Sequence, residues 1–216
     1  MKIRELLING ASELGIELTG HQTELFLDYL DCIKLWNKKI NLTGSKDESQ
    51  MVINHFLDSI SIFSLISENS KLLDIGSGAG FPGIPLKIVM PSLEVTLVDS
   101  VEKKIFFMRE VIRRLGLQKT HAICGRVEDI GNGVARGYFD FVVSRSVGKV
   151  GKLLELGAPY LGEGGKMLLM RGKSGLGEWG QIKDQAAQRF QLLEFKEFSL
   201  PFVKHKRVIL VIEGVQ

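Results

Sequence analysis

The 216-residue chain is long enough for one sizeable folded domain with a smaller appendage. It has no run of 18 or more apolar residues, and its first residues lack the apolar stretch of a signal peptide, so we predict a cytoplasmic protein without a membrane span. The net charge is only +3, but residues 1–70 hold six Lys and Arg against ten Asp and Glu, whereas residues 71–216 hold 22 against 15. This imbalance would attract a nucleic acid to the second part, although ordinary solvation of charged surfaces explains it equally well.

The first 67 residues are predicted to be helical. Two apolar stripes at helical spacing lie there, at 25–36 and 52–63, and turn-forming residues at 43–47 separate them. His55, Asp58 and Ser59 fall within one helical turn, so they could share a face. Hydrogen bonding between buried segments and contact with cofactor or RNA are both open explanations for these three residues.

From residue 71 onward, strands alternate with helices. The sequence predicts strands near 71–75, 94–99, 120–124, 139–143, 165–170, 190–198 and 206–213. It predicts helices at about 84–90, 101–115, 149–161 and 176–187. This alternation indicates an α/β fold with a mostly parallel sheet covered on both faces, and the short turn at 200–203 predicts a final antiparallel hairpin. We therefore predict a helical segment, residues 1–67, packed on a Rossmann-like domain, residues 68–216.

A glycine-rich turn follows the first predicted strand. The apolar strand carries Asp74 near its end and runs directly into Gly76, Gly78 and Gly80. Glycine leaves bare backbone against which a flat, charged cofactor can lie. Nineteen residues beyond Gly80, the second strand ends in Asp99, the position from which a carboxylate reaches the hydroxyls of a ribose. These features predict a nucleoside-cofactor site, and the alternative is a tight strand–helix corner without a ligand.

The spacing of this turn favours S-adenosylmethionine over a dinucleotide. The dinucleotide fingerprint is G-x-G-x-x-G, and Phe81 occupies its third glycine position in this chain, where it is expected to pack near the ligand. Asp74 would lie close to a pyrophosphate and repel it, whereas it would attract the ammonium and sulfonium of S-adenosylmethionine. A nicotinamide-dependent oxidoreductase is therefore the less favoured alternative.

Residues 74–85, DIGSGAGFPGIP, resemble the signature of the bacterial GidB (RsmG) family of small-subunit ribosomal RNA guanine-N7 methyltransferases. Three further stretches agree with that family: WNKKINLT at 36–43, HFLDS at 55–59 and SRS at 144–146. The resemblance implies a class I methyltransferase fold with S-adenosylmethionine as cofactor. It also implies 16S ribosomal RNA or the small ribosomal subunit as partner, with the guanine at nucleotide 527 of the 530 loop as target. We expect a monomer.

Residues that follow the carboxyl ends of the strands complete the predicted site. Val127 and Glu128 follow the third strand, the segment that holds the adenine in methyltransferases, and are expected to bind it here. Arg145 ends the fourth strand, where methyl donor and acceptor should meet. Its guanidinium is expected to orient one of them through paired hydrogen bonds, unless it is only a solvated surface residue.

Three other arginines, Arg126, Arg171 and Arg207, are candidates for holding RNA, and each is also compatible with a plain surface position. The family usually has lysine at the position of Arg171, and arginine offers a planar fork where lysine offers a point charge. No metal site is predicted, because Cys32 and Cys124 lack ligand spacing and the four histidines are scattered.

The expected reaction needs no general base. N7 of guanine carries a lone pair that is unprotonated at neutral pH, so catalysis would rest mainly on holding nitrogen, methyl carbon and sulfur in line. A base in a loop is an easier target than one inside a paired stem. A methyltransferase for another RNA or a small molecule, and a non-enzymatic RNA-binding protein, are the remaining alternatives.

Overall fold

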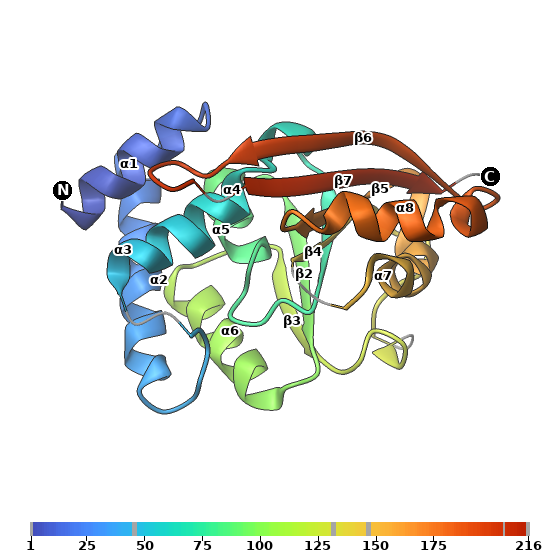
Figure 1. Ribbon diagram of the computed structural model, residues 1–216. Coiled ribbons are helices and arrows are strands. Elements are labelled where there is room, and N and C mark those ends of the chain that lie inside the picture. The colour runs from blue at the N-terminus through green and yellow to red at the C-terminus, as the bar shows by residue number, and fades with distance from the viewer. Residues whose placement is uncertain (1, 45–46, 131–132, 146–147, 205, 215–216) are drawn as a thin grey trace.

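The structure of the chain is a computed structural model that describes residues 2–44, 47–130, 133–145, 148–204 and 206–214 (Figure 1). Ser45 and Lys46 of the predicted turn, Ser146 of the SRS motif, and His205 lie outside the described residues.

The N-terminal segment is helical, as predicted. Its elements are α1 (Ile3–Glu13), α2 (Gly20–Asn37), α3 (Glu48–Met51), the π-helical η1 (Val52–Leu57), α4 (Asp58–Ile60) and the 3₁₀ turn η2 (Phe63–Leu65). A capping box starts α2: the Thr19 hydroxyl accepts from the Gln22 N–H, and the Gln22 side chain accepts from the Thr19 N–H. The π-helix was not predicted. Such widened turns are rare in proteins as a whole, and those that occur are often found at functional sites.

Seven strands form one sheet, which confirms the predicted fold class. They are β1 (Lys71–Ile75), β2 (Glu94–Asp99), β3 (Thr120–Cys124), β4 (Phe139–Arg145), β5 (Leu161–Arg171), β6 (Phe190–Ser199) and β7 (Lys206–Gly214). Their spatial order is β3-β2-β1-β4-β5-β7-β6. The first five are parallel, and β7 lies antiparallel between β5 and β6. The C-terminal hairpin therefore forms one edge of the sheet.

Helices cover both faces of this sheet because neighbouring residues of each buried strand point to opposite sides. The remaining helical elements are α5 (Gly83–Val89), α6 (Glu102–Arg114), α7 (Val150–Gly157), the 3₁₀ turn η4 (Ala158–Tyr160) and α8 (Gly175–Ala186). On β1, Leu72 belongs to the apolar cluster that contains α2, α5 and α6, whereas Leu73 belongs to the one that contains α7. Figure 1 shows the N-terminal helices and the α7–α8 pair at opposite sides of the molecule.

The N-terminal segment shares its core with the sheet domain. Tyr29 of α2 and Phe56 of η1 are buried with ring centroids 5.3 Å apart, and both rings contact Phe81 after the glycine turn. One continuous apolar cluster therefore runs from α1 through to the sheet, and the segment packs directly on the residues that follow β1.

One predicted boundary was wrong. The helix expected to reach residue 161 ends at Gly157, and β5 begins at Leu161 rather than near 165. The start of β5 is rich in glycine, so no apolar alternation marks it. The glycines have a steric reason: a Cβ on Gly165 would come 2.9 Å from the Phe139 carbonyl oxygen of the neighbouring strand. The β4–β5 register shifts at this point.

Candidate active site

The strand order reverses between β1 and β4. From β1 the sheet continues to β2 and β3 on one side, and from β4 it continues to β5 on the other. In open α/β sheets, ligands bind in the crevice outside the carboxyl ends of the strands at such a reversal. The glycine turn follows β1 there, and Arg145 ends β4. The glycine turn and Arg145 therefore lie where this fold class places its ligand crevice.

The glycine turn depends on its glycines for two different reasons. Gly78 and Gly80 both have positive φ values, 62° and 93°, which residues with a Cβ rarely adopt. A Cβ on Gly80 would also come 2.4 Å from Ile84 and 2.9 Å from the Tyr29 hydroxyl. That hydroxyl donates to the carbonyl of Ala79, so a side chain of α2 is hydrogen-bonded to the backbone of the turn. The turn is a fixed cradle of bare backbone.

Asp74 is fully buried beside this turn, and among the described residues only one of its two carboxylate oxygens has a hydrogen-bond partner. Oδ2 accepts from the Gly83 N–H at 2.9 Å, whereas Oδ1 is buried and has no hydrogen-bond partner in the described part of the chain. Burial raises the pKa of Asp74 to about 7, against the opposing effects of its hydrogen bond from Gly83 and the positive charge of Arg145. A ligand ammonium would supply the missing donors and favour the ionised carboxylate.

Asp99 ends β2 with its carboxylate already oriented. Oδ2 accepts from the Gly78 N–H at 2.9 Å and Oδ1 accepts from the Val101 N–H at 2.9 Å, with the Lys104 ammonium 3.4 Å from Oδ2. A carboxylate offers about four lone-pair sites, so capacity remains for the hydroxyls of a ribose. Gly78 thus links the second carboxylate of the site to the glycine turn.

The segment after β3 contributes less than the sequence suggested. The side chain of Val127 is buried, and its carbonyl oxygen accepts from the Tyr160 hydroxyl at 2.6 Å, so an adenine would have to share that oxygen or use another group. The Glu128 carboxylate is exposed and lies 3.7 Å from the Lys152 ammonium. Arg126 is exposed.

Arg145 is the centre of a polar cluster that joins β4 to the π-helix η1. One guanidinium nitrogen donates to the Asn54 carbonyl at 2.9 Å and to Asp58 Oδ2 at 3.1 Å, and the other lies 3.0 Å from His55 Nδ1. The His55 ring stacks on Phe81 at 4.9 Å and 11°. Arg145 is therefore a half-buried residue held by several partners, and the alternative of a solvated surface arginine is wrong.

Two arginines expected to hold RNA are engaged inside the protein. Arg207 donates from Nε to Asp58 Oδ1 at 2.9 Å. The Arg171 side chain is only 6% exposed and forms an ion pair with Glu178 at 2.6 Å while also donating to the Gly148 carbonyl. We therefore withdraw Arg171 as an RNA contact, because a buried, paired guanidinium cannot meet a phosphate. The sequence alone did not reveal the ion pair, because it depends on how α8, which carries Glu178, is placed relative to the end of β5.

The structure explains one of the three residues left open between 55 and 59. Asp58 is buried and accepts from both Arg145 and Arg207, so hydrogen bonding between segments explains it. Sequence reasoning missed the contribution of Tyr29 to the glycine turn and the ring contact of His55. The clustering of His55 and Asp58 on one helical turn was the only signal available for the latter.

Comparisons with known proteins show the family of this chain. Residues 22–212 match the family GidB, described as rRNA small subunit methyltransferase G. The chain belongs to the GidB family. Among its relatives, "Ribosomal RNA small subunit methyltransferase G" of Acetivibrio thermocellus is 41% identical over 99% of this chain and 89% of that protein. The protein of the same name from Geotalea uraniireducens is 39% identical over 98% of this chain and 97% of its own length.

Solved structures support the fold of this GidB-family chain. It resembles M. jannaschii TYW2 in complex with AdoMet, with a TM-score of 0.62 at 16% identity, over 82% of this chain and 80% of that one. It also resembles a SAM-dependent methyltransferase from Aquifex aeolicus, with a TM-score of 0.59 at 18% identity, over 77% and 93% of the two chains. The methyltransferase fold predicted from the sequence is confirmed.

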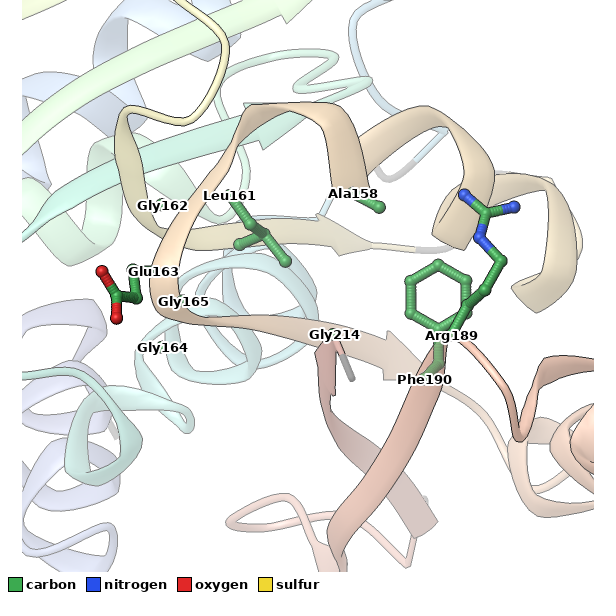
Figure 2. Close-up of a pocket in the computed structure, with 9 residues that line it drawn as sticks. All are labelled: Ala158, Leu161, Gly162, Glu163, Gly164, Gly165, Arg189, Phe190 and Gly214. Atoms are coloured by element: carbon green, nitrogen blue, oxygen red, sulfur yellow. The ribbon is translucent and has the colours of Figure 1, made fainter. Parts of the chain in front are cut away.

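A cavity of about 630 Å³ lies away from these residues, at the amino end of β5 (Figure 2). Figure 2 shows the Arg189 guanidinium near the Phe190 ring on one side and the glycine-rich start of β5 on the other. None of the predicted site residues lines it. It is therefore separate from the crevice at the carboxyl ends of the strands.

Two further properties of the described residues bear on function. Nowhere in residues 2–44, 47–130, 133–145, 148–204 and 206–214 do three or more His, Cys, Asp or Glu side chains gather in a way that could hold a metal ion. None of the helices that the structure describes has the length and apolar composition needed to cross a bilayer.

Proposed function

We propose that this protein transfers the methyl group of S-adenosylmethionine to N7 of a guanine in small-subunit ribosomal RNA. The observation that carries the proposal is the fully buried Asp74 beside the glycine turn, in a crevice at the strand reversal of a GidB-family chain. The names of its relatives point to ribosomal RNA of the small subunit. The family resemblance adds N7 of guanine as the acceptor, and nucleotide 527 in the 530 loop as its position.

The residues of the crevice fit S-adenosylmethionine. The Oδ1 atom of Asp74 is a buried acceptor that lacks a donor in the described chain, and an ammonium group supplies donors and positive charge together. Gly76, Gly78 and Gly80 give the backbone cradle, and Asp99 lies at the end of β2 to accept from ribose hydroxyls. A dinucleotide fits less well, because its pyrophosphate would meet the Asp74 carboxylate.

The chemistry needs positioning rather than proton transfer. The bound cofactor supplies an electrophilic methyl group, and the N7 lone pair takes it as the carbon–sulfur bond breaks. The chain then has to keep the two reactants aligned, and misplacement by about 1 Å can cost on the order of a hundredfold in rate. Arg145 is suited to this task because Asp58, Asn54 and His55 fix its guanidinium at the end of β4.

Further properties follow as part of the proposal. We infer that the protein acts in the cytoplasm, as a monomer, on 16S RNA or the small ribosomal subunit. Exposed basic residues such as Arg126 would contact phosphates of the RNA. Val127 and Glu128 stay as candidates for the adenine, through groups that Tyr160 does not already use.

Three measurements test the proposal. Calorimetry with S-adenosylmethionine and with NAD should show binding of the first only. A labelled-methyl assay with 16S RNA and with small subunits should show transfer, which a non-enzymatic RNA-binding protein would not give. Mapping of 7-methylguanine in ribosomal RNA, from cells with and without the protein, should show one modified guanine lost. Unchanged modification in the deleted strain would refute the proposal.

A further inference from the structure

The His55 imidazole has a defined tautomer. Arginine carries only donors, so the His55 Nδ1 that lies 3.0 Å from the Arg145 guanidinium must accept with its lone pair. The proton of the neutral ring therefore belongs to Nε2. Burial, together with the positive charges of Arg145 and Arg207, lowers the pKa of His55 to about 3, so the ring stays neutral throughout the physiological range.

The orientation of this ring is also fixed. It lies flat on Phe81, which directly follows the glycine turn, with an angle of 11° between the planes. Its partner Arg145 is itself held by Asp58 and by the Asn54 carbonyl. A ring flip would break the bond to Arg145, so the Nε2–H keeps one direction relative to the crevice.

The Nε2–H is available to a ligand. Within the part of the chain that the structure describes, this N–H donates to no other residue. The buried polar atoms that lack a hydrogen-bond partner do not include it. A nitrogen without a partner that is not among those buried atoms has surface open to solvent, so the Nε2–H can be reached. The position is defined by its two neighbours: Phe81 beside the glycine turn and Arg145 at the end of β4.

The chemistry of the acceptor base indicates what this donor meets. A guanine that presents N7 to the crevice also presents O6, because both are acceptors on the same edge of the base. Adenine has the same N7, but carries an amino group, a donor, in place of O6. A fixed N–H donor beside the reacting nitrogen therefore accepts guanine and rejects adenine. A neutral donor also adds no positive charge next to the sulfonium of the cofactor.

We propose that His55 determines base specificity by donating its Nε2–H to O6 of the target guanine. This inference rests on the proposed function, since it assumes that a guanine N7 is the methyl acceptor. Arg145 would act through His55 here as a positioning residue, because three of its five N–H donors are directed to Asn54, Asp58 and His55.

A double-mutant cycle tests the proposal. The RNA is 16S RNA assembled by ligation so that the methylated position carries either guanine or 2-aminopurine, which lacks O6. Single-turnover transfer is measured with the natural enzyme and with His55→Phe. The natural enzyme should be about tenfold slower on 2-aminopurine. His55→Phe should be slower on guanine by a similar factor and lose little more on 2-aminopurine, because O6 then has no partner to lose.

The comparison separates this inference from simpler explanations. Any intrinsic difference in N7 reactivity between the two bases is present in both arms and cancels. Equal losses on 2-aminopurine for the natural enzyme and His55→Phe would overturn the proposal and leave His55 a structural role. Failure of the natural enzyme to methylate guanine would instead reject the proposed function.

A second variant covers the case in which His55→Phe does not fold. Glutamine places an amide N–H₂ near the position of Nε2, so His55→Gln should keep part of the preference for guanine over 2-aminopurine. The exposed His121 gives a matched control, and His121→Gln should leave the preference unchanged. Loss of cofactor affinity, rather than of base preference, in His55→Gln would also contradict the assignment.

Discussion

Asp58 and Arg145 form an ion pair, 3.1 Å between oxygen and nitrogen, although 87 residues separate them in the sequence. Their side chains are 6% and 13% exposed, so the pair is largely shielded from water. The other oxygen of Asp58 accepts from Arg207 of β7. One carboxylate of the N-terminal segment is therefore shared by two strands of the sheet.

The first prediction concerns this carboxylate. Asp58→Asn should lower the free energy of unfolding by about 3–5 kcal/mol, because it leaves two largely shielded guanidinium groups without their counter-charge. Urea unfolding measures the effect. Asp31→Asn, at a position 66% exposed, is the matched control and should change stability by less than about 0.5 kcal/mol. Similar values for the two variants would show that Asp58 contributes no more than a surface pair.

Asp74 should make the cofactor-free protein sensitive to pH. Its folded pKa of about 7 lies above its unfolded value, so the folded state holds a proton that the unfolded state releases. Stability should therefore fall as the pH rises from about 4 to about 7, by at most about 4 kcal/mol, and stay low above that range. Asp74→Asn should remove this loss. A control variant, Asp184→Asn on the exposed side of α8, should keep it.

Asp99→Ala should weaken the binding of S-adenosylmethionine about tenfold or more. The expected loss corresponds to about 1.5–3 kcal/mol for hydrogen bonds to a charged acceptor. Calorimetry gives the dissociation constant, and circular dichroism checks that the variant is folded, because Asp99 also holds the Gly78 N–H. Unchanged affinity in a folded variant would reject the placement of the ribose at the end of β2.

Arg145→Ala should lower the rate of methyl transfer by about a hundredfold if its guanidinium keeps the reactants aligned. Arg145→Lys should recover only part of the rate, since an ammonium cannot satisfy Asn54, Asp58 and His55 from one plane. Single-turnover rates are compared with melting temperatures of the same variants. Near-normal transfer by a folded Arg145→Ala protein would limit this residue to a structural role.

RNA binding should weaken steeply with salt, because basic residues displace counterions from phosphates. Arg126→Glu should reduce RNA affinity and leave cofactor affinity intact. Arg189→Glu, the same charge change at the amino end of β6, is the control and should have a smaller effect. Arg207→Glu is a poor probe of RNA contact, because its carboxylate would face Asp58 and destabilise the fold.

Local pattern predicted most of the fold, and the long-range pairings could not be predicted. Alternating apolar runs located all seven strands, and the glycine turn with Asp74 marked the end of β1, beside the reversal of the strand order. The start of β5 was missed because its glycines are there for a close approach of neighbouring backbones, which leaves no apolar period. The partners of Arg171 and Arg207 were missed because a sequence shows that an arginine is charged but does not show which carboxylate will lie beside it in the fold. Asp58 and Arg207 are 149 residues apart.

The position of β7 has a consequence for the stability of the Asp58 cluster. It is the C-terminal strand of the sheet, it lies between β5 and β6, and it carries Arg207, which completes the Asp58 cluster. Asp58 and Arg207 are 149 residues apart, and a contact between such distant parts of a chain has to overcome the entropy of closing a long loop. The ion pair between Asp58 and Arg207 is therefore lost whenever the C-terminal hairpin opens, and the carboxylate that holds Arg145 then has one partner fewer.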